Sequence, residues 1–115
     1  LVTARQQGRS IASALGFSMS QATMIATAIS ELARNIVTYA SPGEILLRAD
    51  GELGLVIIAR DNGPGIVNVQ AALQPGFSTA GGLGLGLPGV RRIADSFDIQ
   101  SGPDGTTITM TKKTP

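Results

Sequence analysis

The sequence predicts an α+β fold, a two-layer sandwich in which helices cover one face of a mixed, mostly antiparallel sheet. The elements follow the order helix, helix, strand, strand, loop, helix, strand, strand, without the alternating βαβ units of a doubly wound parallel sheet. The segment 53–61 is apolar on both faces, as expected for a central strand under helices. With 115 residues, 43% of them apolar, and no internal repeat or linker, we expect residues 1–115 to form a single domain.

Two amphipathic helices are predicted in the first third of the chain. An apolar stripe predicts a helix over residues 3–15, formed by Ala4, Gly8, Ile11, Ala12 and Leu15. Gly16 is the expected C-terminal stop, and Ser18 or Ser20 caps a second helix that reaches about Tyr39. The core stripe of this second helix consists of Ala22, Ile25, Ile29, Leu32 and Ile36.

Strand patterns and one further helix fill the rest of the chain. Strands are predicted at 44–50 and 53–61, a weak helix at 68–74, and a helix at 88–96 with Pro88 in its first turn. The segments 97–101 and 105–113 flank a "GPDG" turn and predict a terminal hairpin. In its last strand, Ile108 and Met110 alternate with threonines, so we expect one buried face.

Composition excludes several function classes. The net charge of +1 and the absence of a basic stripe with aromatics argue against nucleic-acid binding, and no apolar run is long enough for a membrane span. The absence of Cys is compatible with a reducing cytosol, so we expect a cytoplasmic protein. The absence of His excludes Ser-His-Asp triads and ordinary zinc sites. Any chemistry must therefore use carboxylates, amides, hydroxyls and backbone groups.

A first polar cluster lies in the long helix, in "SELARNIVTYA". Glu31 and Asn35 are four residues apart and therefore share one strip of the helix surface, beside the core stripe. Their oxygens suit Mg²⁺, which takes few protein ligands and keeps waters or phosphates, and Glu31 could also accept a proton from a hydroxyl. The alternative is a solvated helix face on which Glu31 pairs with Arg34.

A second cluster, "RDNGPGI", follows the apolar strand. Asp61 closes the strand and can accept a hydrogen bond from a ligand's amino group, while Gly63 and Gly65 allow the backbone to pass close to a flat ring. The alternative is an ordinary turn, because Asp, Asn, Gly and Pro are the usual turn residues.

A third cluster is the glycine-rich stretch "GGLGLGLPGVRR". Gly82, Gly84 and Gly86 alternate with leucines and lead into a helix, so their amides can form an anion-binding nest. No Gly-Lys-Ser/Thr follows, which excludes a Walker loop, and a flexible low-complexity loop is the alternative. Together the three clusters suggest one site for a nucleoside triphosphate, with an acidic base, a metal-binding amide and a phosphate nest.

These motifs resemble those of a known superfamily. "ELARN", "DNGPGI", "GLGLGL" and the late "GT" of Gly105-Thr106 resemble the N box, both glycine boxes and the final Thr motif of the GHKL ATPases, which share the Bergerat ATP-binding fold. The four motifs appear in the expected order across nearly the whole chain. Within the superfamily, "ARQQGRSIASALGF", "AISELARNIVTYA" and "GFSTAGGLGLGLPGVRRIAD" are most similar to RsbT-type switch serine kinases of the bacterial stressosome.

The resemblance implies a role for each matching residue, with ATP and Mg²⁺ as cofactors. Glu31 would be the catalytic base, and Asn35 would hold Mg²⁺. At the adenine end, Asp61 would receive the amino group, Gly63 and Gly65 would lie near the ring, and Thr106 would give support through water. Gly82, Gly84 and Gly86 would bind phosphate oxygens from a mobile lid, and Ser78 and Thr79 at the start of this lid are candidates only. Arg34 would touch phosphate or a partner unless it pairs with Glu31.

The implied function is an ATP-dependent serine/threonine kinase in a partner-switching system. Its substrate would be an RsbS-like STAS-domain antagonist on the stressosome scaffold, and the released kinase would bind and activate an RsbU-like phosphatase. Three alternatives are an anti-sigma factor kinase that sequesters a sigma factor, a detached ATP-binding domain of a histidine kinase, and a catalytically silent binding module. Since the chain begins with Leu1 rather than Met, we also expect a short preceding segment to have been trimmed.

Overall fold

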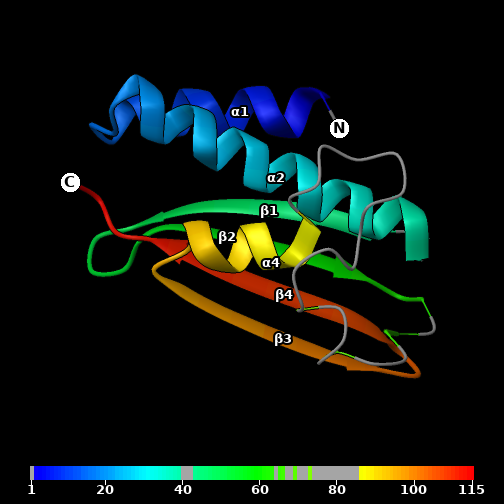
Figure 1. Cartoon of the computed structure of the whole chain (residues 1–115). Helices are drawn as coiled ribbons and strands as arrows, with labels where there is room; N and C mark the ends of the chain where they lie inside the picture. Colours follow the sequence, from blue (N-terminus) through cyan, green and yellow to red (C-terminus); the bar gives the residue numbers. More distant parts are fainter. Residues whose placement is uncertain (1, 40–42, 64, 67–68, 70–72, 74–85) are drawn as a thin grey trace.

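Three helices and four strands form two layers. The structure, a computed structural model, describes residues 2–39, 43–63, 65–66, 69, 73 and 86–115. Helices α1, α2 and α4 lie on one side of the sheet (Figure 1), which confirms the predicted α+β class. The elements are α1 (Val2–Ala14), α2 (Met19–Tyr39), β1 (Gly43–Asp50), β2 (Gly54–Asp61), α4 (Gly86–Ile93), β3 (Ser96–Gly102) and β4 (Gly105–Lys112).

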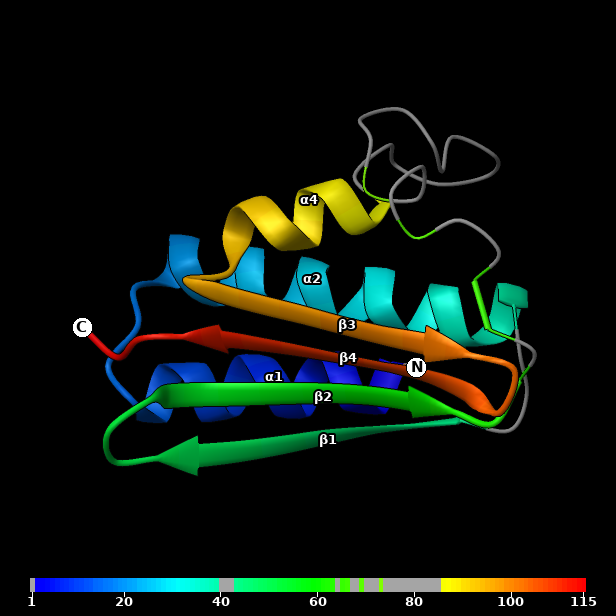
Figure 2. The ribbon, with the colours of Figure 1, turned by 90° about the horizontal axis from the view of Figure 1, so that it is seen from below.

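The sheet has the strand order β1-β2-β4-β3, seen from its open face in Figure 2. We expected a mixed, mostly antiparallel sheet, but all three pairings between the described strands are antiparallel. The reason lies in the crossover through α4: β2 and β3 run in the same direction, but β4 returns between them and pairs with both. In this register Asp61 lies directly opposite Thr106.

Local signals set the junction between α1 and α2 as the sequence predicts. After α1, the amide of Phe17 donates to the carbonyl of Ala12 at 3.1 Å, a bond that typically closes a helix whose stop is a glycine, here Gly16. Ser18 is the cap of α2: its Oγ accepts from the amide of Gln21 at 3.1 Å, and Gln21 Oε1 accepts from the Ser18 amide at 3.2 Å. This reciprocal pair is a capping box.

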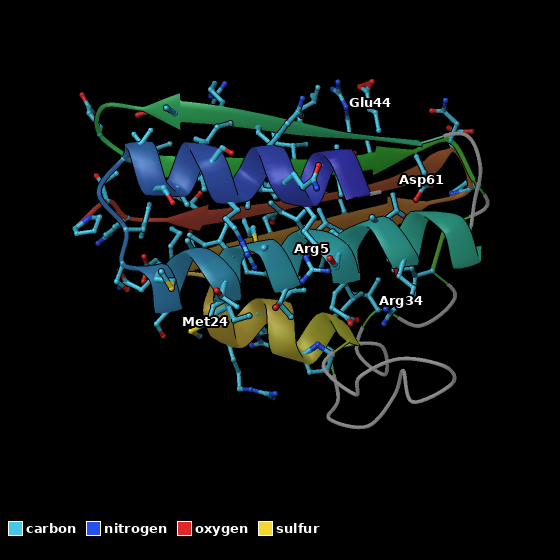
Figure 3. All side chains as sticks on the ribbon, turned by 90° about the horizontal axis from the view of Figure 1, so that it is seen from above. Arg5, Met24, Arg34, Glu44 and Asp61 are labelled. Atoms are coloured by element: carbon cyan, nitrogen blue, oxygen red, sulfur yellow. The ribbon has the colours of Figure 1, made fainter. Side chains whose placement is uncertain are left out.

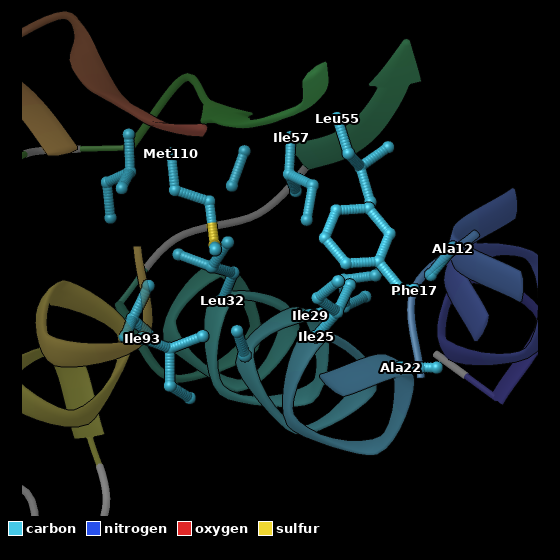
Figure 4. Packing of buried hydrophobic residues seen from close by; sticks show 14 of the residues in the cluster. Ala12, Phe17, Ala22, Ile25, Ile29, Leu32, Leu55, Ile57, Ile93 and Met110 are labelled. Atoms are coloured by element: carbon cyan, nitrogen blue, oxygen red, sulfur yellow. The ribbon is translucent and has the colours of Figure 1, made fainter. Parts of the chain in front are cut away.

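The core lies between α2 and the central strands (Figure 4). The predicted stripe of α2 is buried from Ala22 to Leu32, while the side chain of Ile36 lies outside the described residues. Burial of each large aliphatic side chain contributes about 1.5–3 kcal/mol. The largest fully buried side chains are Ile25, Ile29, Leu32, Leu55, Ile57, Val90, Ile108 and Met110.

Two predictions about the later elements need correction. The helix predicted at 88–96 is α4, which begins at Gly86 and ends at Ile93. Ser96 instead begins β3 and pairs with Thr111, because bonds across the sheet override the local helical pattern. Thr111, expected on a solvent face, is buried beside its cross-strand neighbour Val56.

The remaining predicted elements need little adjustment. Most of the helix predicted at 68–74 lies outside the described residues, although the Leu73 amide donates to the Val69 carbonyl as in a helical turn. The other helices and strands agree with prediction to within one residue at each end. None of the described helices combines the length and apolarity that crossing a membrane requires.

The turn between β1 and β2 is fixed by Asp50. Its Oδ1 accepts hydrogen bonds from the amides of Leu53, at 2.9 Å, and Glu52, at 2.8 Å. These two bonds lower the pKa of Asp50, since they favour the charged carboxylate.

Candidate active site

The predicted site residues that the structure describes gather at one end of the molecule. The C-terminal half of α2, the N-terminus of α4, the ends of β2 and β3 and the start of β4 meet there (Figure 2), and Figure 3 shows Arg34 and Asp61 toward this same end. Five polar side chains are buried among the described residues, and four of them are predicted site residues. These four are Glu31, Asn35, Asp61 and Thr106, each between 4% and 8% exposed. Because burying polar groups is costly, their concentration at one end indicates a functional site.

The carboxylate of Asp61 is held by backbone amides. Its Oδ1 accepts from the amide of Gly63 at 3.0 Å and from the amide of Thr106 at 3.2 Å. The second bond follows from the strand register, which places Thr106 opposite Asp61. Since both described bonds end on Oδ1, Oδ2 is the oxygen best suited to receive a ligand's amino group.

Ser101 is a site residue that the sequence did not reveal. Its Oγ accepts from the amide of Ile66 at 2.6 Å and lies 2.8 Å from Oγ1 of Thr106. The side chain therefore ties β4 to β3 and to the segment that follows Asp61. The only sequence signal is its place beside the "GPDG" turn, where hairpin pairing puts it opposite Thr106.

Two glycines permit close backbone approach in this region. Gly65 has a φ of +87°, and a Cβ there would meet the carbonyl oxygen of Gly102. Gly105 has a φ of +143°, and a Cβ there would meet the carbonyl oxygen of Asp61. Both backbone conformations favour glycine, so a side chain at either position would force these segments apart.

Glu31 joins α2 to α4. Its Oε1 lies 2.9 Å from Nη1 of Arg34, and its Oε2 accepts from the amide of Gly86 at 3.1 Å. Gly86 is the first residue of α4, where amides lack helical partners and the helix dipole favours negative charge. The ion pair with Arg34 thus exists, but the alternative of a solvated helix face is wrong, because Glu31 is only 6% exposed.

Asn35 lies one turn beyond Glu31 on α2 and is 7% exposed. Within the part of the chain that the structure describes, no three His, Cys, Asp or Glu residues cluster closely enough to hold a metal ion. A single amide oxygen beside a carboxylate fits Mg²⁺ if nucleotide phosphates and waters supply the other ligands. The donor set therefore fits a metal that arrives with a nucleotide.

A hollow of about 720 Å³ opens at the same end of the sheet. Asp61, Ser101 and Gly105 contribute to its lining, but Glu31, Asn35 and Gly86 do not. The adenine-end residues Gly63, Gly65 and Thr106 do not line it either. Of the predicted site residues that the structure describes, only Asp61 borders the hollow, so the hollow does not coincide with the predicted site. Four other predicted residues, Ser78, Thr79, Gly82 and Gly84, lie outside the described residues.

Comparison with known proteins agrees with this arrangement. The family model described as a histidine kinase-like ATPase domain matches residues 1–112. Serine/threonine-protein kinase RsbT of Bacillus subtilis (strain 168) is 52% identical over 112 residues, covering 94% of this chain and 84% of the relative. An anti-sigma F factor of Bacillus licheniformis is 33% identical over 103 residues, covering 82% of this chain and 70% of the relative.

Solved structures show the same fold at low sequence identity. The histidine kinase domain of the blue-light activated kinase from Erythrobacter litoralis EL346 has a TM-score of 0.59 at 20% identity, over 85% of this chain and 50% of the other. The chain thus spans half the length of that structure. The mycobacterial sensor histidine kinase MprB also gives 0.59, at 19% identity, over 82% of this chain and 74% of the other.

These similarities confirm the predicted superfamily and the predicted class of enzyme, a serine/threonine kinase. The four-stranded sheet with its helices is the fold of histidine kinase ATPase domains. The chain belongs to the family of histidine kinase-like ATPase domains.

Proposed function

We propose that this protein uses ATP and Mg²⁺ to phosphorylate a STAS-domain antagonist similar to RsbS, and that the released kinase then binds and activates an RsbU-like phosphatase. One observation carries the proposal. Two buried carboxylates, Glu31 and Asp61, lie at the same end of a domain that is 52% identical to a serine/threonine kinase. Phosphoryl transfer needs alignment and charge stabilisation more than covalent chemistry. A reaction on a stressosome scaffold in the cytoplasm is part of this proposal.

On this proposal Asp61 receives the amino group of adenine. The bonds to the amides of Gly63 and Thr106 fix the carboxylate before the nucleotide arrives. Gly65 lies near the ring, and Thr106, with its neighbour Ser101, supports the adenine end through water. Because these groups are fixed in advance, binding costs little reorganisation.

The phosphate end uses different groups. Asn35 would hold Mg²⁺, which would neutralise phosphate charge. The amides of Gly82 and Gly84 donate to phosphate oxygens, and so does the amide of Gly86 once it leaves Glu31. Glu31 accepts the proton of the attacking hydroxyl. Both of its oxygens have partners in the structure, so Glu31 must exchange Arg34 or Gly86 for the substrate hydroxyl.

A second candidate is an anti-sigma factor kinase, which the 33% identity to anti-sigma F factors favours. Its site would be the same, but the kinase would sequester a sigma factor. Binding to candidate sigma factors, measured with and without ATP, separates the two functions.

The decisive experiment combines purified protein, ATP, Mg²⁺ and candidate STAS-domain proteins. We expect calorimetry to detect ATP binding and intact mass measurement to show the addition of one phosphoryl group to a STAS-domain protein. Asp61→Asn serves as the control that slows transfer at limiting ATP concentration, because its ATP affinity is reduced. The absence of both ATP binding and phosphorylation with folded protein would refute the proposal.

A further inference from the structure

The small net charge of the chain conceals a separation between its two layers. Helices α1, α2 and α4 carry five arginines and one carboxylate, a net charge of +4. The strands and their turns carry four basic and seven acidic residues, a net charge of −3. The helix-layer arginines are Arg5, Arg9, Arg34, Arg91 and Arg92.

The charge that the helix layer presents to solvent is positive only. Its single carboxylate, Glu31, is buried, whereas Arg34 is 38% exposed and the other four helix-layer arginines are exposed. Among the ion pairs of the described residues, those outside the helix layer join Arg60 to Glu44 at 2.7 Å and Lys112 to Asp95 at 3.7 Å. Two of the four basic residues outside the helices, Arg60 and Lys112, thus have acidic partners, while Arg5, Arg9, Arg91 and Arg92 appear in none of those ion pairs.

The composition of this surface favours a protein partner. All its basic residues are arginines, and α2 adds the exposed methionines Met19 and Met24, which are 86% and 45% exposed. Arginine and methionine are enriched in protein interfaces, while nucleic-acid surfaces usually interleave basic residues with aromatic ones. Among the helix side chains whose burial the structure describes, which do not include Tyr39, none is an exposed aromatic.

The position of Glu31 gives this surface a role. Figure 3 looks onto the helix layer and shows Arg5 and Arg34 on it. A protein substrate must bring its hydroxyl to Glu31, which lies on α2 beside Arg34. A substrate that reaches Glu31 over the outer side of α2 lies against the helix layer, where it meets the arginines.

We propose that the outer face of the helix layer docks an acidic surface of the protein substrate. The inference rests on the proposed kinase function and adds the surface and the charge through which the substrate binds. Positive and negative surfaces attract before contact, so this pairing raises the association rate and weakens with salt.

A matched pair of double variants tests the inference. Arg9→Glu with Arg91→Glu changes two helix-layer arginines on α1 and α4, and Arg48→Glu with Lys113→Glu makes the same charge change outside the helices. All four side chains are exposed, and none belongs to the proposed catalytic site. Circular dichroism and ATP affinity verify that both variants are folded.

The substrate in the assay is the STAS-domain protein that the wild type phosphorylates. We expect the helix-layer variant to raise the KM for this protein about tenfold or more at low salt, with kcat and ATP affinity close to wild type. The control variant should leave KM nearly unchanged, and wild-type KM should rise with ionic strength. Equal KM values in the two variants would refute the docking surface while leaving the kinase function intact.

Binding measurements with duplex DNA and with anionic vesicles test whether another class of partner uses this surface. Binding of wild-type protein to duplex DNA or anionic vesicles as tightly as to the STAS-domain protein, lost in the helix-layer variant, would also overturn the inference. A wild type that binds ATP but phosphorylates no STAS-domain protein removes the proposed function instead, and that result is distinct from a failure of docking.

Discussion

Two buried carboxylates at the same end of the molecule are held in different ways. Asp61 accepts hydrogen bonds from backbone amides beside the strands β2 and β4, whose register fixes their positions. Glu31 binds the half-exposed side chain of Arg34 and the first amide of α4. The described partners of Asp61 are backbone amides alone, whereas Glu31 combines one backbone amide with one partly exposed side chain. This difference suits the proposed roles, a fixed adenine contact for Asp61 and a proton acceptor at Glu31 that exchanges a partner for the substrate hydroxyl.

The hydrogen bonds of Asp61 and the ion pair of Glu31 also differ in how much they stabilise the fold. A hydrogen bond to a charged group contributes about 1.5–3 kcal/mol, while an exposed ion pair contributes about 0.2–1 kcal/mol. Since Arg34 is 38% exposed, its pair with Glu31 lies toward the lower value. Substitutions at the two carboxylates and at Arg34 test this comparison.

The largest effect is expected from Glu31→Gln, which keeps the size of the side chain and removes the proton acceptor. Phosphotransfer should fall about 100- to 10,000-fold, because general-base catalysis typically contributes that much. ATP affinity should stay close to wild type. Single-turnover phosphotransfer and calorimetry measure the two quantities separately, and a full transfer rate would exclude Glu31 as the base.

A smaller effect, on binding instead of chemistry, is expected from Asp61→Asn. Its Oδ1 can still accept from the amides of Gly63 and Thr106, so the fold should be retained. The new amide group presents a donor to the adenine amino group, and ATP affinity should fall about tenfold or more. Calorimetry gives the affinity, and a value equal to that of the wild type would refute the adenine contact.

The smallest effect is expected from Arg34→Ala. It removes the exchangeable partner of Glu31 but leaves the bond to the Gly86 amide. The free energy of unfolding should fall by about 1 kcal/mol or less, discounted for exposure of the pair. Urea unfolding measures this change, with Arg34→Lys as the control that keeps the charge. A loss larger than about 2 kcal/mol would place Arg34 among the fixed contacts.

Prediction from sequence succeeded where the signal was local. The stop after α1 and the cap at Ser18 depend on residues within one turn, and the structure shows the hydrogen bonds that both predict. Motif matches assigned Glu31, Asn35, Asp61 and Thr106 to one site, and all four side chains are buried in the structure. Their roles with ATP and Mg²⁺ stay predictions.

Prediction failed where pairing between distant segments decided the outcome. The end of α4 depends on β3, whose first residue pairs with Thr111 in β4. Ser101 was missed because its contacts with Ile66 and Thr106 arise from a hairpin folded against another loop. The local pattern does not reveal the end of α4, and for Ser101 it offers only a position beside the "GPDG" turn.

The sequence by itself determined the fold class, the caps and most helix and strand limits, because hydrophobic periodicity and turn chemistry act over a few residues. Only the tertiary structure decided that α4 donates its first amide to Glu31, a contact between positions 55 residues apart. It alone also showed that Glu31, the one carboxylate of the helix layer, is buried, so that this layer presents only positive charge to solvent. Such properties depend on which distant segments pack together, and that packing is a property of the whole chain.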